Sequence, residues 1–441
     1  MPNVLSNVSS NQEVPIFPQG FMFGVSTAAC QIEADIPDCN WHMWSHQTKE
    51  DGTPRAPVDN RKCDAINRFP QDVEIMKSLG VNVYRFSVCW SRINPNQGVF
   101  NEEAIQMYRN WCIYLKSNGI EPMVTLWHFE HPAWIEQRGS VKGPEFVPRF
   151  ADFCERVVSQ LHDVCSIFHT LNEPIGFAVS SYLAGIHPPG AGSITDFCDA
   201  MANLFKAHVA AYQIIKRYNP SAMVSYAKNV VAFVPMHSWS LLEHIAAYYM
   251  NHYTRIGFKP FEKGYFRFLW QKREIPGIIN TLDFISVNHY YCGFVTLNCN
   301  EWSVVEGNKM PFLSYGENFV PTSDFGWGLI TSSLASVMQW INDQSNPRKL
   351  KMMISEHGLA DNTDSRRQWF LQESLFHLSR AVSMGLPLMG YIHWTLYDNY
   401  EWAEGTRMKF GLFETNFETM DRKPRESAKL YSNIIAAQFN Q

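Results

Sequence analysis

The sequence predicts a single-domain α/β fold, a (β/α)8 TIM barrel with long loops at its C-terminal face. Eight short apolar runs alternate with amphipathic helical stretches along the 441 residues. Such alternation is typical of a parallel sheet, and eight β/α units close that sheet into a barrel. No change in composition and no Gly/Ser-rich linker divides the chain, so we expect one domain despite its length.

The apolar runs indicate the strands, and short polar signals indicate where helices between them begin and end. Asn101 and two acidic residues precede one helix, which is expected to end near Gly119. Helices are also expected over residues 196–218 and 365–384. The expected strands are residues 21–25, 81–87, 122–128, 166–171, 222–226, 283–288, 352–355 and 389–394.

Three long stretches without regular periodicity follow the first, sixth and eighth strands. They cover residues 33–62, 293–326 and 399–421, and we expect them to be irregular. Loops at the carboxyl ends of barrel strands build the walls of a binding site. Residues 1–16 are expected to form a poorly ordered N-terminal extension, and residues 17–441 the catalytic barrel.

Composition favours a globular protein that binds neither nucleic acid nor an anionic membrane. Hydrophobic residues make up 46% of the chain and charged residues 18%, with a formal net charge of −5 and no basic stripe. No run reaches the roughly 18 apolar residues of a membrane span. The 14 Trp, 18 Tyr and 30 Phe residues suit a carbohydrate site, because sugar C–H faces stack on aromatic rings, although packing explains most of them.

The ten cysteines and the N-terminus indicate a reducing compartment. The cysteines are scattered singly without a CxxC pair, as is typical of buried, reduced thiols. Residues 1–19 have neither a basic start nor an apolar core, so no secretion signal is expected there. We therefore expect a cytoplasmic protein. The oligomeric state is left open by the sequence, with a homo-oligomer among the options.

Two glutamates stand where buried strands are expected to end. Glu173 lies in Leu-Asn-Glu-Pro after the fourth strand, and Glu356 lies in Ser-Glu-His-Gly after the seventh. Either residue alone is explained as a helix N-cap or a turn residue. Together, two carboxylates at the C-terminal end of one barrel indicate the acid/base and nucleophile pair of a glycosidase.

Other polar and aromatic side chains also follow the apolar runs. Each has a structural alternative: His128 as a core histidine, Arg85 as the partner of a core acid, and Trp394 as packing. Their common position at strand ends favours a shared site. The group comprises Gln31, Arg85, Trp127, His128, Asn172, Glu173, Asn288, Tyr290, Glu356, Trp394, Glu401 and Trp402.

Six segments of the chain resemble, in order, the characteristic motifs of family 1 glycoside hydrolases, the β-glucosidase family. The resemblance extends from about residue 17 to about residue 431 and is far more specific than a lone Asn-Glu-Pro. The segments are residues 21–34, 84–93, 169–174, 283–290, 354–358 and 394–412.

This resemblance implies a retaining exo-β-glycosidase, with β-glucosidase as the expected activity and some tolerance of β-galactosides or β-fucosides. Glu356 would be the nucleophile, and Glu173 would be the acid and then the base. Glu173 therefore needs a raised pKa, whereas Glu356 needs a low pKa maintained by Arg85 and Tyr290. No cofactor and no metal are implied. The expected catalytic residues are Glu173, Glu356, Arg85, Asn288 and Tyr290.

The resemblance also implies a set of sugar-binding residues. Asn172 would bind the 2-hydroxyl, Trp394 would lie beneath the ring and Trp402 beside it. Trp327 would line the outer, aglycone side, where Phe312 and Phe319 hint at an apolar aglycone, although ordinary loop packing explains them equally well. The expected binding residues are Gln31, His128, Asn172, Trp327, Trp394, Glu401, Trp402 and Phe410.

Two positions bear on the class of small-molecule β-glycoside. The phospho-sugar branch of the family has a Ser and a Lys where this chain has Glu401 and Met408, so the sugar is expected to be unphosphorylated. A carboxylate would repel a phosphate. Glu173 argues against the plant thioglucosidase branch, which has Gln at this position.

The chain departs from the family motifs at several positions. Phe129 replaces a Trp and so removes an N–H donor to a sugar hydroxyl. His289 and His357 replace a Tyr and an Asn, and His357 adjoins the expected nucleophile, where it is able to shift that group's titration. Thr406 stands where a Tyr is common. None of these changes removes a catalytic group.

Three other functions remain as alternatives. His128 and His131 suggest a metal-dependent hydrolase, but Pro132 indicates a turn there and not the helix of an HExxH motif. A non-catalytic glycan-binding barrel is disfavoured because both carboxylates are present. A transglycosidase that uses an alcohol in place of water has the same expected residues, so the sequence does not separate it from a hydrolase.

Overall fold

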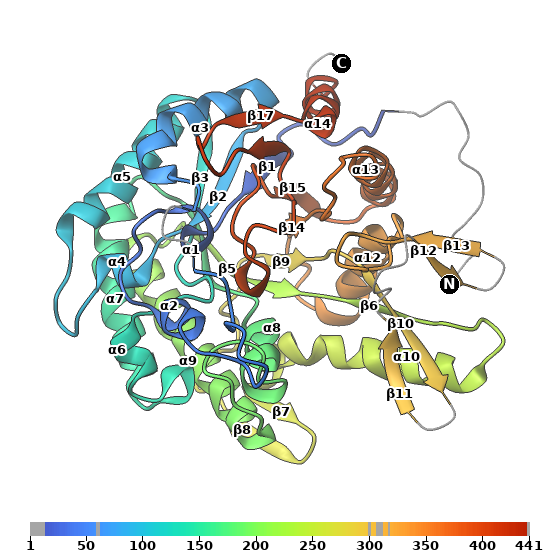
Figure 1. Ribbon diagram of the computed structural model, residues 1–441, viewed down its shortest axis with the longest axis horizontal. Helices are drawn as coiled ribbons and strands as arrows, with labels where there is room; N and C mark the ends of the chain where they lie inside the picture. The colour runs from blue at the N-terminus through green and yellow to red at the C-terminus, as the bar shows by residue number, and fades with distance from the viewer. Residues whose placement is uncertain (1–13, 59–61, 299–300, 306–311, 316–317, 439–441) are drawn as a thin grey trace.

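A closed barrel of eight parallel strands forms the centre of the protein and confirms the predicted fold class. The computed structural model describes residues 14–58, 62–298, 301–305, 312–315 and 318–438. Figure 1 shows the strands in the middle of the molecule with helices around them. Their order around the barrel is β1-β15-β14-β9-β5-β4-β3-β2. The strands are β1 Met22–Ser26, β2 Val83–Ser87, β3 Glu121–Thr125, β4 Ile167–Asn172, β5 Met223–Asn229, β9 Ile285–Asn288, β14 Met352–His357 and β15 Leu388–Trp394.

Helices surround the barrel, with α3, α5 and α7 on one side of Figure 1 and α12, α13 and α14 on the other. The α-helices are α1 Ala29–Ile32, α2 Asn40–Ser45, α3 Ala65–Leu79, α4 Trp90–Ile93, α5 Glu102–Ser117, α6 Ala133–Glu136, α7 Phe146–Leu161, α8 Pro174–Ala178, α9 Ile194–Tyr218, α10 Leu241–Thr254, α11 Lys259–Lys263, α12 Ser333–Ser345, α13 Arg367–Ser383 and α14 Glu426–Ala436. Short 3-10 segments are η1 Ser140–Lys142, η3 Arg255–Gly257 and η4 Trp402–Glu404, and η2 Val179–Leu183 is a π-helical turn.

The predicted helix signals act as expected. The Asn101 side chain accepts a hydrogen bond from the backbone N–H of Ala104 and so caps α5. Gly119, with φ +74°, follows the end of the same helix in the left-handed region. None of the helices in the described ranges is apolar over a length sufficient to cross a membrane.

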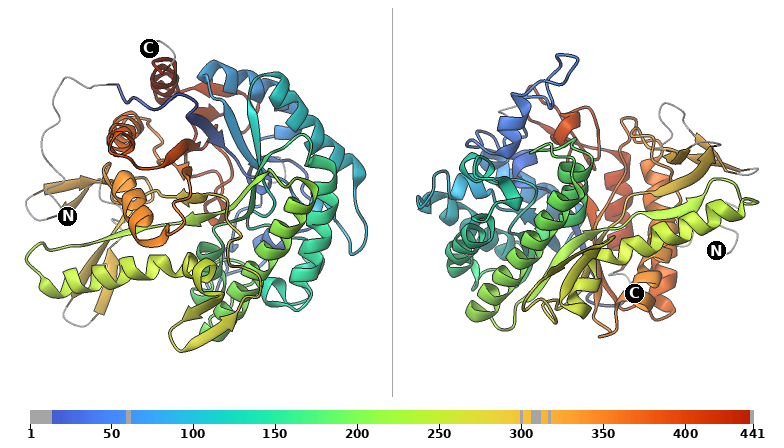
Figure 2. Two further views of the ribbon diagram at one scale, coloured as in Figure 1. Left: turned by 180° about the vertical axis from the view of Figure 1, so that it is seen from behind. Right: turned by 90° about the horizontal axis from the view of Figure 1, so that it is seen from below.

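The loops contain more regular structure than the sequence predicted. The stretch 293–326, expected to be irregular, contains most of β10 Cys292–Asn298 and all of β11 Glu301–Val305, β12 Phe312–Tyr315 and β13 Asn318–Pro321. Strand β10 pairs with β6 Ala232–Pro235 and with β11, so a small sheet stands beside the barrel. Figure 2 shows these additions outside the barrel. The other short strands are β7 Tyr265–Phe268, β8 Gln271–Glu274, β16 Phe413–Thr415 and β17 Arg422–Pro424.

Inward-facing apolar side chains close one end of the barrel. They form a separate cluster made of Val83, Met123, Ile167, Phe284, Met353 and Ile392. Each of the five that lie on a strand comes before the polar residues that end it. This arrangement leaves the carboxyl ends of the strands as the place for polar chemistry.

The N-terminal expectation lies largely outside the described residues. Residues 1–13 are not among them. Pro15 accepts a hydrogen bond from Gln438 Nε2 through its carbonyl, and the backbone N–H of Phe17 donates to Gln438 Oε1. Residues 15–17 are thus fastened beside the end of α14.

Candidate active site

Glu173 is the first residue after β4 and has a left-handed backbone conformation, with φ 39° and ψ 53°. It precedes α8, yet within the described chain its side chain makes no capping hydrogen bond. Its carboxylate instead accepts hydrogen bonds from Asn288 Nδ2 at 2.7 Å and Asn229 Nδ2 at 3.2 Å. The simple N-cap explanation therefore does not apply to Glu173.

Glu356 lies near the end of β14 and is almost fully buried. Its Oε1 forms an ion pair with Arg85 Nη1, and its Oε2 accepts a hydrogen bond of 2.6 Å from the Tyr290 hydroxyl. Arg85 is held in turn by His169 Nδ1 at 3.0 Å and Thr125 Oγ1 at 3.2 Å, both from Nε. The Arg85 guanidinium therefore places a buried positive charge directly against the Glu356 carboxylate.

Two asparagines connect the carboxylates. Asn172 Oδ1 accepts from Arg85 Nη2 at 2.7 Å and from Asn288 Nδ2 at 3.1 Å. Asn288 also donates to Glu173, so hydrogen bonds run from Glu356 through Arg85, Asn172 and Asn288 to Glu173. The structure therefore brings all five predicted catalytic residues and Asn172 into one network.

The barrel geometry explains how this network forms. Glu356 and Asn288 are neighbours in the register of β14 and β9. The register shifts just before Glu356 in β14 and between His169 and Asn172 in β4. Such irregularities turn a side chain toward a site and are common beside active sites.

The environments of the two carboxylates differ in the way that acid/base chemistry requires. Burial, followed by the negative charge of Glu356, raises the pKa of Glu173 to about 7, against the opposing hydrogen bond from Asn288. Glu356 instead has a cation and a phenol as direct partners. Glu173 is thus able to hold a proton near neutral pH beside an ion-paired Glu356.

Strand β5 contributes two residues that the sequence analysis missed. Asn229 binds Glu173 directly, and the neighbouring Lys228 is buried, with its stem beside Gly257 and Ile175. Burial lowers the pKa of Lys228 to about 8, against the attraction of Glu173. The signal was the polar pair Lys228-Asn229 after an apolar run, but we expected this strand to end at residue 226.

Three of the predicted sugar-binding residues contact one another. Glu401 accepts hydrogen bonds from Gln31 Nε2 and Trp394 Nε1, each at 3.2 Å. Burial raises the pKa of Glu401 to about 8 despite these bonds. Among the described residues, the buried Gln31 Oε1 has no hydrogen-bond partner. This corner of the site therefore offers a carboxyl group and an amide oxygen for sugar hydroxyls.

His128 lies between the catalytic network and the aromatic wall. Its Nε2 is 3.0 Å from Asn172 Nδ2, and its ring stacks on Trp394 with centroids 5.8 Å apart. Burial, followed by the charge of Arg85, lowers the pKa of His128 well below its usual range. The Nδ1 atom has no partner in the described part of the chain. A neutral imidazole of this kind suits a hydroxyl ligand.

Phe129 fills the place that a Trp occupies in the family motif. Its ring packs on Phe177, with centroids 5.8 Å apart, and on Trp402, at 5.4 Å. Trp402 also packs on Trp41, at 4.7 Å. The Nε1 of Trp41 donates to the carbonyl of Phe129. These contacts hold Trp402 in an aromatic wall beside His128.

A second aromatic group lies beyond Tyr290. Trp327 stacks on Phe325 with ring centroids 4.4 Å apart and on Tyr291 at 4.6 Å. Phe410 is buried in the same cluster, 5.9 Å from Tyr290. Trp327 keeps part of its surface exposed, as the outer wall of a site requires. The side chains of Phe312 and Phe319 lie outside the described part of the chain.

The two unusual histidines point away from the carboxylates. His289 is held by the Val230 carbonyl and by Ser333 Oγ, both at 2.7 Å. His357 Nδ1 contacts the Tyr391 hydroxyl at 2.9 Å, on the opposite face of β14 from Glu356. Burial lowers the pKa of both histidines. Neither side chain forms a hydrogen bond with Glu356 among those described.

The histidines of the proposed metal site also separate. His131 Nε2 lies 2.8 Å from Glu136 Oε2, whereas His128 faces Asn172. Within the described ranges, no group of three or more His, Cys, Asp or Glu side chains converges as metal ligands do. The metal-dependent alternative therefore gains no support from this pair.

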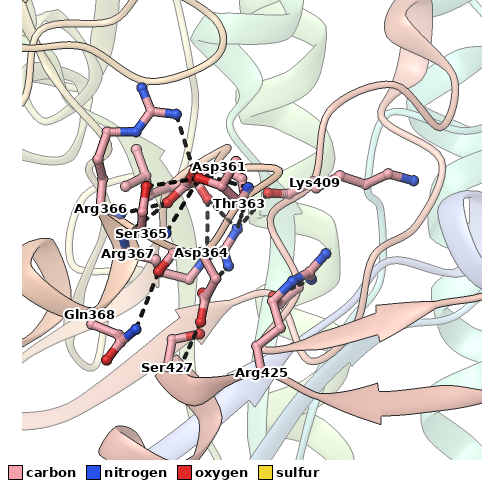
Figure 3. Close-up of polar contacts among 12 residues, drawn as sticks. Asp361, Thr363, Asp364, Ser365, Arg366, Arg367, Gln368, Lys409, Arg425 and Ser427 are labelled. Carbon is pink, nitrogen blue, oxygen red and sulfur yellow. Dashed lines mark hydrogen bonds and ion pairs between the residues drawn. The ribbon is translucent and has the colours of Figure 1, made fainter. Parts of the chain in front are cut away.

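A buried ionic cluster fastens the loop after β14 to the loop after β15 (Figure 3). Arg367 pairs with Asp364 and donates to the carbonyls of Asp361 and Lys409, each at 2.7 Å. Asp361 also accepts the backbone N–H of Arg366 at 2.8 Å. Because Phe410 follows Lys409, the cluster positions one wall of the site.

Comparison with known proteins supports the same assignment of family. The model of the family described as glycosyl hydrolase family 1 matches residues 14–439. Beta-glucosidase A of Acetivibrio thermocellus is 28% identical over 95% of this chain and 98% of its own length. The structure of a family 1 β-glucosidase from Thermotoga maritima superposes with a TM-score of 0.86 at 27% identity, over 97% of this chain and 99% of that one. The structure of a β-glycosidase from Pyrococcus horikoshii superposes with a TM-score of 0.85 at 28% identity, over 97% of this chain and 96% of that one.

Proposed function

Because the chain belongs to glycosyl hydrolase family 1 and is an O-glycosyl hydrolase of the β-glycosidase type, we propose that it is a retaining exo-β-glucosidase. The observation that carries this proposal is the pair of carboxylates in opposite environments. Burial and the charge of Glu356 favour the protonated form of Glu173, whereas Glu356 lies against Arg85. A retaining glycosidase needs this division between acid/base and nucleophile.

In the first step, Glu356 attacks the anomeric carbon while Glu173 protonates the departing oxygen. The bond from the anomeric carbon to Glu356 forms as the bond to the aglycone breaks. In the free protein, the negative charge of Glu356 is one cause of the raised pKa of Glu173. The glycosyl ester formed in this step no longer carries that charge. The pKa of Glu173 therefore falls in the intermediate, and Glu173 is ready to take a proton from water.

In the second step, water deprotonated by Glu173 attacks the anomeric carbon and releases Glu356. Arg85 and Tyr290 stabilise the departing carboxylate through the contacts that they make in the free protein. Asn172, held by Arg85 and Asn288, presents its amide to the sugar 2-hydroxyl. A hydrogen bond to this hydroxyl strengthens in the oxocarbenium-like transition state.

The sugar preference is proposed from the opposite wall. Glu401, Gln31 and His128 provide a carboxyl group, an amide and an imidazole around Trp394. A phosphorylated sugar does not suit Glu401, because an ionised carboxylate repels it and a protonated one offers a single donor. We therefore propose an unphosphorylated glucoside as the principal substrate, with galactosides and fucosides as weaker ones.

The test is hydrolysis of nitrophenyl β-glycosides followed by NMR of the first-formed sugar anomer. The proposal predicts turnover of the β-glucoside ahead of the galactoside and fucoside, with a β-anomer as the first product. An α-anomer as the first product would mean inversion and would contradict the assigned roles. Faster turnover of a 6-phospho-glucoside would contradict the proposed sugar class.

A further inference from the structure

Helix α10 has its apolar face turned outward. Leu241, Ile245, Tyr248 and Tyr249 are exposed, whereas Glu243, Ala246 and Ala247 are buried against the protein. A surface helix normally shows the reverse pattern, with an apolar stripe toward the core. We define the α10 stripe as the exposed apolar residues Trp239, Leu241, Leu242, Ile245, Tyr248, Tyr249 and Tyr253.

The six members of the α10 stripe that lie on the helix share one side of it, and Trp239 stands just before its N-terminus. At 100° per residue, positions 241, 242, 245, 248, 249 and 253 fall within an arc of about 140°. Trp239 is 81% exposed, Leu241 72% and Tyr248 66%. Figures 1 and 2 show α10 at the outside of the molecule, away from α3, α5 and α7. The stripe is therefore one continuous surface that a partner is able to reach.

The stripe is not needed to hold α10 on its own chain. Asn251 forms two hydrogen bonds with the backbone of Phe233 in β6, at 2.9 and 2.7 Å. Glu243 accepts hydrogen bonds from the backbone N–H of His237 at 2.7 Å and from its ring Nδ1 at 2.9 Å. Ala246 and Ala247 pack with Val295 of β10. The inward face thus accounts for the attachment, and the outward face is left for another molecule.

The area of the stripe matches half of a stable dimer interface. With roughly 150–250 Å² for each large side chain when fully exposed, scaled by exposed fractions that run from 42% to 81%, the seven residues present about 800 Å². The largest apolar patch on a typical monomer is about 300–600 Å². A standard protein interface buries about 800 Å² on each partner.

Charge selects the kind of partner. None of the seven residues in the stripe is charged, and residues 241–254 contain neither Lys nor Arg. Burial and the nearby cations Lys259 and Arg255 lower the pKa of His252, which lies within the same arc. Helices that lie on membranes carry Lys and Arg for the lipid headgroups, which this helix lacks. A neutral apolar surface is best matched by another neutral apolar surface.

We propose that the α10 stripe is the dimer interface of this protein, and that its occupant is the α10 stripe of a second copy. In a two-fold symmetric dimer the same patch contacts itself. Two antiparallel α10 helices at the usual 8–10 Å separation bring Ile245, at the middle of the stripe, close to its counterpart. This inference is independent of the proposed activity.

The test combines sedimentation of the full chain with matched isoleucine variants. Wild-type protein is expected to sediment with twice the mass of one chain at micromolar concentration. Ile245→Glu places two negative charges against each other in the dimer interface, so the dissociation constant of the dimer should rise at least about 100-fold. Ile113→Glu is the matched control, because Ile113 of α5 is 46% exposed and Ile245 is 42% exposed. The control should remain dimeric, and the melting temperature of both variants shows that they are folded.

Cross-linking identifies the surface itself. Ile245→Cys should form an intermolecular disulfide under mild oxidant, whereas Ile113→Cys should not, since only the central stripe residue meets its counterpart. A monomeric wild type overturns the proposal. A dimer unaffected by Ile245→Glu and without the cross-link also overturns it. If the wild type is a monomer that floats with phosphatidylcholine vesicles, and Ile245→Glu does not float, then the α10 stripe contacts a membrane and not a second copy.

Discussion

At the scale of single residues, the account depends on the different roles of Glu173 and Glu356. We predict that Glu356→Ala abolishes turnover of every glycoside, because no group then forms the intermediate. Glu173→Ala should lose about 10²–10⁴-fold in kcat/KM for alkyl glucosides, the usual contribution of a general acid. Activated aryl glucosides need no proton on the leaving group, so their glycosylation step should survive.

The two variants are separated by kinetics with several leaving groups and by added azide. Azide should partly restore Glu173→Ala and give the β-glycosyl azide, since it attacks the intermediate without a general base, whereas any azide product of Glu356→Ala should be the α-anomer, since it forms by direct attack on the substrate. Equal and unrescued loss in both variants for all leaving groups would contradict the assignment.

Lys228 provides a second prediction at this scale, on the pH profile. The pKa of Glu173 is about 7, and the positive charge of Lys228 opposes its rise. We predict an alkaline limb of kcat/KM near pH 7 in the wild type. Lys228→Met removes the cation, so the pKa of Glu173 rises and the limb moves to higher pH.

Lys228→Arg is the matched control, because it keeps a cation that does not lose its proton in this range. Its alkaline limb should stay close to that of the wild type. An unmoved limb in Lys228→Met, with the fold intact by circular dichroism, would show that Lys228 has no effect on Glu173.

At the scale of elements, the end of β14 leaves no room for an added side chain. A Cβ on Gly358 would lie 1.8 Å from the carbonyl oxygen of Trp394 in β15. We predict that Gly358→Ala displaces both strand ends, lowers the free energy of unfolding by at least about 2 kcal/mol as overpacking does, and reduces kcat. Gly192→Ala is the control, since nothing lies within 4 Å of a Cβ there. Chemical denaturation of both variants checks this, and equal stability would contradict it.

The sequence predicted the barrel strands and not the additions between them. A parallel barrel strand is apolar on both faces, so an apolar run such as residues 222–226 predicts a strand. Helix α10 keeps a helical spacing of apolar residues, but the sequence analysis placed no element there, and the short hairpins of residues 293–326 resemble loop composition. Local pattern predicts that an element forms, and it does not show whether the apolar face of that element is turned toward the core or outward.

The site was predictable where function places a polar group at the end of an apolar run. Glu173 and Glu356 met this condition and lie in one network. Asn229 did not meet this condition, because we expected its strand to end at residue 226, whereas β5 extends to Asn229. His357 adjoins Glu356 in the sequence, but adjacent residues on a strand face opposite sides, and the His357 side chain contacts Tyr391.

At the scale of the whole molecule, buried titratable groups predict how stability depends on pH. The buried side chains of His208, His289 and His393 have pKa values of about 4, 4 and 3, below the usual 6.5. The unfolded chain takes up these protons first on acidification, so stability falls as pH decreases below 6.5. Glu173 and Glu401 have pKa values raised from 4.5 to about 7 and 8. Their contribution to the free energy of unfolding is complete below pH 4.5 and is lost as the pH rises toward 8.

Between pH 6.5 and 8 the raised carboxyl pKa values should therefore dominate, and we predict greatest stability near pH 6.5. Glu173→Gln combined with Glu401→Gln should flatten the decrease between pH 6.5 and 8, because an amide does not titrate. Thermal denaturation across this range checks the prediction. A decrease of the same slope in the double variant would show that other groups cause it.

The measurement that tests the central claim most directly is mass spectrometry after incubation with a 2-deoxy-2-fluoro-glucoside bearing a good leaving group. The fluorine slows both the formation and the hydrolysis of the glycosyl-enzyme. The good leaving group restores the rate of formation, so the covalent intermediate accumulates. The account predicts one added fluoroglucosyl mass on the peptide that contains Glu356, with loss of activity in proportion. Label on another residue, or full turnover of ordinary glucosides with no label, would contradict the account.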